Sequence, residues 1–279
     1  MQIHAPAKLN LCLYLGPRRT DGLHELCSLF EPLAFADLID VEEGDRDEVV
    51  CPGVEGGNLA GRALAALRER GWRHPPLRIE IEKRIPVAAG LGGGSADAAA
   101  VLRLAAGDVA QLGEIAARIG ADVPSQLVPS LSLVGGAGER VERLPDPEPH
   151  AVVLLPGGGG LSTAEVFAEA DRLGLGRSAE ELEEVAGRLR AMAGAGASPL
   201  AYAELLVNDL EPAARSLRPE IGDALDVLRA AGAPLALLTG SGPTAFGLFG
   251  SLADARASAA RIEREDAIVC TAGSAEELA

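Results

Sequence analysis

Six consecutive residues in the first half of the chain could bind a phosphate group. They read Gly90-Leu91-Gly92-Gly93-Gly94-Ser95, and no helix breaker follows them from Ala96 to Ala106. Residues without a Cβ let successive backbone N–H groups turn toward an anion, and the N-terminus of the next helix adds its positive dipole end. The loop has neither the lysine of a Walker loop nor the glycine spacing of a dinucleotide-binding fingerprint. The alternative is a flexible turn or a close contact between a strand and a helix.

Two isolated charged residues are further candidates for chemistry. Lys8 interrupts a stretch that is otherwise apolar or neutral, and Asp122 follows a glycine within Gly120-Ala121-Asp122-Val123-Pro124. Each also has a purely structural explanation, because a lysine can point out of a half-solvated sheet and an aspartate can cap the next helix. The sequence alone does not bring the two side chains together.

Two more glycine-rich segments are more typical of turns or loops than of anion-binding sites. The segment Thr239 to Phe246 could form a second turn that faces an anion, but Gly and Pro between strands more often mark a tight turn alone. The run from Gly157 to Gly160 is typical of a mobile loop.

The elements that must position these residues alternate between strands and helices. Leucines at period two predict a half-buried strand from Ile3 to Leu15, and a second alternating pattern predicts a strand from Leu77 to Glu82. A helix is expected from Ala96 to Ala106, and another from a cap at Asp108 through Ile119. The glycine loop should therefore lie between a strand and a helix.

The proline-rich stretch Pro145 to Pro149 favours an extended connector and divides the chain near its middle. We expect an N-terminal domain over residues 1–148 and a C-terminal domain over residues 149–279. Because neither half shows an unbroken series of βαβ units, the predicted fold class is α+β with mixed sheets. The elements predicted in the second half are strands at Ala151–Leu155, Leu235–Leu238, Phe246–Phe249 and Ala267–Cys270, and helices at Ser178–Met192 and Pro219–Ala231.

Composition and charge exclude several classes of protein. The 25 Lys and Arg residues against 41 Asp and Glu residues give a net charge of −16, so nucleic acid is not an expected partner. With 48% hydrophobic and 24% charged residues, the chain is too apolar to be disordered. Glycines and prolines interrupt the uncharged stretch from Ala230 to Ala253, and the N-terminus has no signal-peptide pattern, so neither a membrane helix nor secretion is expected. Four well-separated cysteines, Cys12, Cys27, Cys51 and Cys270, are typical of buried thiols in a reducing cytoplasm.

Five motifs in order along the chain resemble the GHMP kinases, the superfamily of galactokinase, homoserine kinase, mevalonate kinase and phosphomevalonate kinase. The similarity extends from residue 6 to about residue 250. The glycine loop and the Gly-Ser-Gly-Pro-Thr motif are typical of the superfamily. The Ala-Lys-Leu-Asn and Asp-Gly-x-His motifs resemble the members that act on a cytidine-diphosphate-linked methylerythritol. The motifs are Pro6-Ala7-Lys8-Leu9-Asn10-Leu11, Arg19 to Leu26, Pro86 to Ala100, Gly120 to Pro124, and Gly240 to Thr244.

This resemblance implies an enzyme that transfers the γ-phosphoryl group of ATP to the 2-hydroxyl of that substrate in isoprenoid-precursor synthesis, with Mg²⁺ neutralising the β- and γ-phosphates. It also implies an N-terminal α/β domain with the phosphate loop and a C-terminal ferredoxin-like domain. The expected partners are the small-molecule substrate and ATP, without nucleic acid or membrane, in a monomer or a weak homodimer. The alternatives are a GHMP kinase for another alcohol and a non-catalytic nucleotide or metabolite sensor. Retention of Lys8 and Asp122 favours an enzyme.

The resemblance further implies roles for single residues. Lys8 and Asp122 match a catalytic pair, in which the carboxylate accepts the hydroxyl proton and the ammonium stabilises the oxyanion. No residue is matched to a metal ligand. On the substrate side the matches are Asn10, His24, Thr163, Phe167 and Ser241, with Phe167 as the aromatic that stacks on cytosine. The implied ATP-binding residues are Asn58, Pro86, Gly90, Leu91, Gly92, Gly93, Gly94, Ser95 and Ala96.

Three residues depart from the family pattern. Leu23 stands where the Asp-Gly-x-His segment usually has tyrosine, Ser125 stands where an aromatic residue usually follows Pro124, and Ala96 replaces a second serine. The first two changes are expected to remove aromatic surface on the cytidine side. They leave the identity of the acceptor substrate open.

Overall fold

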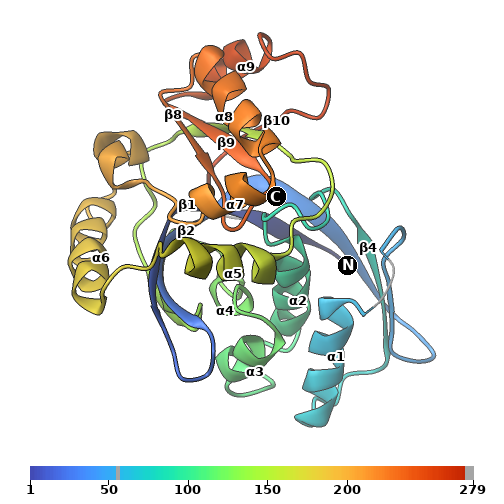
Figure 1. Cartoon of the computed structure of the whole chain (residues 1–279). Coiled ribbons are helices and arrows are strands. Elements are labelled where there is room, and N and C mark those ends of the chain that lie inside the picture. Colours follow the sequence, from blue (N-terminus) through green and yellow to red (C-terminus); the bar gives the residue numbers. More distant parts are fainter. Residues whose placement is uncertain (55–56, 274–279) are drawn as a thin grey trace.

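Two β-sheets organise the chain, and helices pack on both of them (Figure 1). The computed structural model describes residues 1–54 and 57–273. The first half contains strands β1 (Gln2–Arg18), β2 (His24–Glu43), β3 (Glu48–Val50), β4 (Leu77–Glu82), β5 (Ser132–Gly136) and β6 (Arg140–Arg143), with helices α1 (Leu59–Glu69), α2 (Gly93–Arg103), α3 (Leu112–Ile119) and α4 (Val123–Gln126). The second half contains strands β7 (Ala151–Leu155), β8 (Leu235–Leu238), β9 (Ala245–Phe249) and β10 (Ile268–Thr271). Its helices are α5 (Thr163–Leu173), α6 (Ala179–Ala193), the 3₁₀ helix η1 (Pro199–Leu205), α7 (Glu211–Leu217), α8 (Glu220–Ala230) and α9 (Leu252–Ala259).

The first sheet has the order β3-β4-β2-β5-β6, and β1 pairs with β2 as a long antiparallel ribbon. The second sheet has four antiparallel strands in the order β10-β7-β9-β8. The predicted α+β class is confirmed; the first sheet is mixed, because β3 pairs with β4 in parallel, and the second is antiparallel. The chain passes from one sheet to the other between Arg143 and Ala151, across the proline-rich connector. The division into domains at residue 148 stays a prediction.

Strand β1 is buried on both faces, so the expectation of a half-buried strand is wrong. Leu9 and Leu11 lie in a core shared by the two sheets, whereas Leu13 and Leu15 lie in the core of the second sheet. A register shift in the pairing with β2 separates the two pairs, because an extra residue in β1 reverses which side chains face each core. A period-two pattern in the sequence does not show such a bulge.

Strand β7 is an inner strand of the second sheet, between β10 and β9, and its predicted position is confirmed. Val152 and Leu154 face the core shared with the first sheet, while Ala151, Val153 and Leu155 face the helices of the second half. Burial on both faces accounts for its continuous apolar run. The three short strands predicted near the C-terminus are β8, β9 and β10, each within one residue of the expected bounds.

The helix predictions hold for the second half and need correction in the first. Ser178 forms a capping box with Glu181 at the start of α6, and α8 begins after Pro219. In the first half α2 begins within the glycines, at Gly93. Asp108 does not cap α3, because its carboxylate accepts a hydrogen bond from the Trp72 indole at 3.2 Å and the helix starts only at Leu112.

Helices α1, α2 and α3 form one group against the first sheet (Figure 1). Their apolar side chains pack against those of β2 and β4, including Ile39, Ile79 and Ile81. This packing holds the N-terminus of α2 beside the end of β4, so the glycine loop is fixed at both of its ends.

All four cysteines are free thiols, as predicted, but Cys51 is only half-buried, so the expectation that all four are buried is wrong for it. Within the described residues, no helix combines the length and the apolar character that crossing a membrane requires. The cytoplasmic location and the monomer or weak homodimer stay predictions.

Candidate active site

The glycine loop packs against the second glycine turn, Thr239–Thr244, from the other half of the chain. Gly90 has a φ of +80°, and a Cβ on it would lie 2.8 Å from the Gly242 carbonyl oxygen. A Cβ on Gly240, whose φ is +58°, would lie 3.0 Å from Oδ1 of Asn10. Only glycine fits these close approaches, so the second turn is part of the same site.

Lys8 lies beneath this pair of turns with 5% of its surface exposed. Its Nζ donates a hydrogen bond to Oδ1 of Asn10 at 2.5 Å and lies 3.4 Å from Oδ2 of Asp122. The Phe30 ring centroid is 4.8 Å from the same nitrogen. The explanation that Lys8 points out of a half-solvated sheet is therefore wrong, because the glycine turns cover that face of β1.

Asp122 occupies the position before α4, but its side chain makes no capping hydrogen bond there. The capping explanation is therefore wrong, and the carboxylate is turned toward Lys8. Its side chain is 31% exposed, so one side remains open to a cavity.

A buried hydrogen-bond network orients Asn10. Its Nδ2 donates to Oγ of Ser28 at 2.9 Å, and its backbone N–H donates to Oγ1 of Thr239 at 2.9 Å. Because the amide nitrogen is directed to Ser28, the amide oxygen is directed to Lys8. An ammonium group has three N–H donors, and this arrangement leaves Lys8 able to donate to a further oxygen.

A cavity of about 470 Å³ extends along the glycine loop. The residues predicted to bind ATP line it, with the exception of Ala96, whose side chain is fully buried against the first sheet. The expected contact of Ala96 with ATP is thus not supported by its position. Asn58 also has a structural role, because its Oδ1 accepts from the Ala60 N–H at 2.7 Å and caps α1. Leu91 contributes backbone, since its side chain is buried and its carbonyl accepts from the Lys8 N–H at 2.9 Å.

Sequence analysis missed a buried charged cluster at the edge of this cavity. Nζ of Lys83 donates to Oδ2 of Asp97 at 2.9 Å and also to Asp37, whose Oδ1 accepts from the backbone N–H groups of Arg84 and Ile85 at 2.6 and 2.8 Å. Burial raises the pKa of Asp97 to about 7, against the opposing effect of the Lys83 charge. The signal that could have revealed the cluster is Asp97, a single aspartate among the alanines of α2.

A second cavity, of about 620 Å³, is lined by Lys8 and Asp122 and shares Gly90, Gly92 and Thr163 with the first. The five predicted substrate-side residues all line it. His24 is only 8% exposed, so it is not a surface turn residue, and its ring centroid is 5.5 Å from that of Phe167 at an angle of 35°. Oγ1 of Thr163 and Oγ of Ser241 are 3.0 Å apart, and Thr163 borders both cavities.

Two departures from the family pattern have different locations. Leu23 is 55% exposed and lines the second cavity at the turn between β1 and β2. Ser125 is buried within α4, where its hydroxyl donates to the Asp122 carbonyl oxygen at 2.8 Å. Ser125 does not line this cavity, and the expectation that its change removes aromatic surface there stays a prediction.

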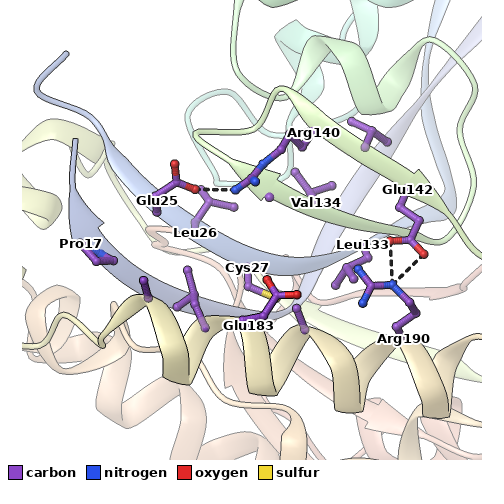
Figure 2. A pocket seen from close by; sticks show the side chains of 15 residues that line it. Pro17, Glu25, Leu26, Cys27, Leu133, Val134, Arg140, Glu142, Glu183 and Arg190 are labelled. Carbon is purple, nitrogen blue, oxygen red and sulfur yellow. Dashed lines mark hydrogen bonds and ion pairs between the residues drawn. The ribbon is translucent and has the colours of Figure 1, made fainter. Parts of the chain in front are cut away.

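A further cavity, of about 730 Å³, lies between α6 and strands β2, β5 and β6 (Figure 2). Its arginines are already paired, Arg140 with Glu25 at 2.6 Å and Arg190 with Glu142 at 2.9 Å. Paired arginines do not offer the free positive charge that a phosphate needs, so this cavity is a weaker candidate for phosphate binding than the glycine loop.

The described residues contain no group of three or more His, Cys, Asp or Glu side chains that could hold a metal ion. Mg²⁺ in phosphoryl-transfer enzymes is held largely by substrate phosphates and water, with one or two protein ligands. The Ser95 hydroxyl near the start of α2 lines the glycine-loop cavity and offers one such ligand, whereas the Asp122 carboxylate lines the neighbouring cavity. The site therefore fits a cation that arrives with the nucleotide.

Comparison with known proteins gives a consistent result. Residues 58–129 match the GHMP kinases N terminal domain, and residues 187–267 match the GHMP kinases C terminal domain. A 4-diphosphocytidyl-2-C-methyl-D-erythritol kinase of Mesorhizobium japonicum is 37% identical, covering 97% of this chain and 95% of its own. A Streptomyces coelicolor protein of the same name is 40% identical, covering 87% and 85%. The crystal structure of a 4-(cytidine 5'-diphospho)-2C-methyl-D-erythritol kinase superposes with a TM-score of 0.80 at 35% identity, covering 98% of this chain and 100% of that one.

Proposed function

Because the chain belongs to the GHMP kinases, and among them to the 4-diphosphocytidyl-2-C-methyl-D-erythritol kinases, we propose that it phosphorylates this cytidine-diphosphate-linked alcohol with ATP. The acceptor is the 2-hydroxyl of the methylerythritol unit, and the product belongs to non-mevalonate isoprenoid-precursor synthesis. The observation that carries the proposal is the Lys8–Asp122 pair, 3.4 Å apart between the glycine-loop cavity and the cavity of His24 and Phe167. Gly90, Gly92 and Thr163 line both cavities, and the Lys8 side chain lies against Gly92 where the cavities meet.

The glycine loop holds the triphosphate in this proposal. Successive backbone N–H groups from Gly90 to Gly94 and the N-terminus of α2 supply partial positive charge where the phosphates carry negative charge. Ser95 and Thr163 line the same cavity, and their hydroxyls can donate to phosphate oxygens. The net charge of −16 does not oppose this binding, because the local N–H groups determine it.

Asp122 is the proposed base. Its carboxylate accepts the proton from the acceptor hydroxyl as the oxygen attacks the γ-phosphorus, and the bond from that phosphorus to the leaving oxygen of ADP breaks. Lys8, whose Nζ lies 3.4 Å from Oδ2 of Asp122, donates to the oxygens on which charge develops. Asn10 holds the Lys8 ammonium at this point through its 2.5 Å hydrogen bond.

The Ser95 hydroxyl, which lines the glycine-loop cavity, would hold Mg²⁺ together with the phosphates. When bound, the cation would neutralise the β- and γ-phosphates. The protein's own part is to keep this hydroxyl beside the glycine loop.

His24 and Phe167 are the proposed cytosine-binding residues. The Phe167 ring lines the cavity and offers a flat face for stacking, and the His24 ring offers a polar edge. Because Leu23 stands in place of tyrosine, the rings of His24 and Phe167 must provide most of the contacts that recognise cytosine.

A coupled assay of ADP release tests the function. The purified chain is assayed with ATP, Mg²⁺ and, in turn, the cytidine-diphosphate-linked methylerythritol, mevalonate and homoserine. Saturable turnover with the cytidine compound alone is expected. Turnover with another alcohol instead would show a different GHMP kinase, and turnover with none would favour a sensor.

A further inference from the structure

Arg103, the last residue of α2, is a partly buried cation that binds backbone carbonyl groups. Its Nη1 donates to the carbonyl oxygen of Gln126 at 2.8 Å, and its Nη2 donates to that of His4 at 3.0 Å. Within residues 1–54 and 57–273 it forms no ion pair, and burial lowers the pKa of its guanidinium group without an opposing acidic side chain. A charge withdrawn from water depends on the acceptors that it reaches, so these two carbonyl groups determine where the guanidinium lies.

The two carbonyl groups belong to the two elements that carry the catalytic pair. His4 lies in β1, four residues before Lys8. Gln126 is the last residue of α4, four residues after Asp122. Helix α4 lies beside α2 (Figure 1), so one side chain of α2 reaches both elements. The planar guanidinium group therefore joins the strand of the lysine to the helical turn that follows the aspartate.

Helix α4 can transmit the position of Gln126 to Asp122, because it is a single turn. The Ser125 hydroxyl donates to the Asp122 carbonyl oxygen at 2.8 Å, which closes this turn on itself. A direct hydrogen bond between α4 and β1, from Nε2 of Gln126 to the Pro6 carbonyl oxygen, is 3.5 Å long and therefore weak. The two charge-assisted hydrogen bonds of Arg103 are shorter and stronger.

We propose that Arg103 is a positioning residue for phosphoryl transfer, whose guanidinium group joins β1 to α4 and so sets how Lys8 and Asp122 face each other. This inference rests on the proposed function. Arg103 lines neither the glycine-loop cavity nor the cavity of His24. Its loss should therefore slow the chemical step and leave the binding of ATP unchanged.

The kinetics of Arg103→Ala provide the first test. In the ADP-release assay kcat should fall about 10- to 100-fold with the KM for ATP unchanged, because a shift of about 1 Å at reacting groups has an effect of this size. Arg68→Ala is the matched control. The Arg68 guanidinium also donates to backbone carbonyl oxygens, those of Trp72, His74 and Pro75, but none of them belongs to β1 or α4.

Both variants should lose stability in urea denaturation, and only Arg103→Ala should lose kcat. If folded Arg103→Ala kept its kcat within about threefold of the wild type, or if Arg68→Ala lost as much, Arg103 would have a structural role alone and the proposal would be overturned.

Chemical rescue separates the guanidinium group from a general effect on the fold. Arg103 borders a cavity of about 500 Å³ that Trp72 and Leu104 also line, so truncation to alanine opens a path from this cavity toward the two carbonyl groups. Ethylguanidinium has the atoms that the truncation removes, and it should raise the kcat of Arg103→Ala by about 10-fold. Arg103→Met fills the same space with an uncharged chain and should lose kcat without rescue. Equal rescue of both variants, or none at concentrations that leave the wild type folded, would contradict the proposal.

Hydrogen exchange reports on the link without any turnover. In Arg103→Ala the backbone amides of α4 should exchange faster, because the helix has lost one of its attachments, whereas Arg68→Ala should match the wild type. Unchanged exchange in Arg103→Ala would overturn the proposal. A wild type that failed to use the cytidine substrate would instead overturn the proposed function, and the exchange rates would still show whether Arg103 holds α4 in place.

Discussion

Replacing Gly92 with alanine should disturb the catalytic pair, Lys8 and Asp122, and lower kcat at only a modest cost in stability. Gly92 has a φ of +69°, which costs a residue with a Cβ about 1–2 kcal/mol. The new Cβ would also lie 2.7 Å from Cγ of Lys8, so that methylene must retreat by about 0.7 Å to reach an ordinary contact of 3.4 Å. Lys8 cannot simply rotate away, because Asn10 and Asp122 hold its ammonium and Phe30 lies beside it. A displacement of this size at a reacting group can lower kcat by about 100-fold.

Gly71→Ala is the matched control. Gly71 has a φ of +83°, and a Cβ there would meet nothing within 4 Å. Both variants should lose similar stability in urea denaturation, but only Gly92→Ala should lose kcat in the ADP-release assay. If Gly92→Ala lost the stability expected for alanine in a left-handed conformation but kept its kcat within about threefold of the wild type, the result would show that the glycine loop does not position Lys8.

Three further predictions concern single side chains. Asp122→Asn should lower kcat by about 10²- to 10⁴-fold with the affinity for ATP nearly unchanged; retention of more than half of the turnover would contradict its role as base. Phe167→Ala should raise the KM for the cytidine substrate by about 5- to 150-fold, because a stacked base contributes about 1–3 kcal/mol, and an equal rise in the KM for ATP would argue against stacking. Burial alone would lower the pKa of His150, but the Glu31 charge and the hydrogen bonds of both ring nitrogens raise it above 6.5. The stabilisation is therefore fully present below about pH 6.5 and lost as pH rises through the folded pKa. In Glu31→Gln burial and the hydrogen bond to the Glu148 carbonyl oxygen remain, and burial, which lowers the pKa of His150, is the larger of the two effects. Urea midpoints should therefore instead rise over that range, and slopes of the same sign in both proteins would refute the pairing.

The sequence by itself determined the chemistry that the chain can perform and most of the regular elements of its second half. The glycine loop, Lys8 and Asp122 are visible as residue types at defined positions, and the apolar runs of β7 and β9 identify buried strands. Local signals such as the capping box at Ser178 also fix where α6 begins, because a cap and the helix it starts are neighbours in the chain.

Only the tertiary structure decided which of these residues meet. Lys8, Asp122 and the turn at Gly240 are far apart along the chain, and their contact depends on the packing of the two sheets around β1. The bulge in β1 directs identical leucines into two different cores, and no period in the sequence marks it. The Asp37–Lys83–Asp97 cluster was hidden for the same physical reason: a charged residue looks solvent-exposed in a sequence until its buried partner, brought from another element, is known.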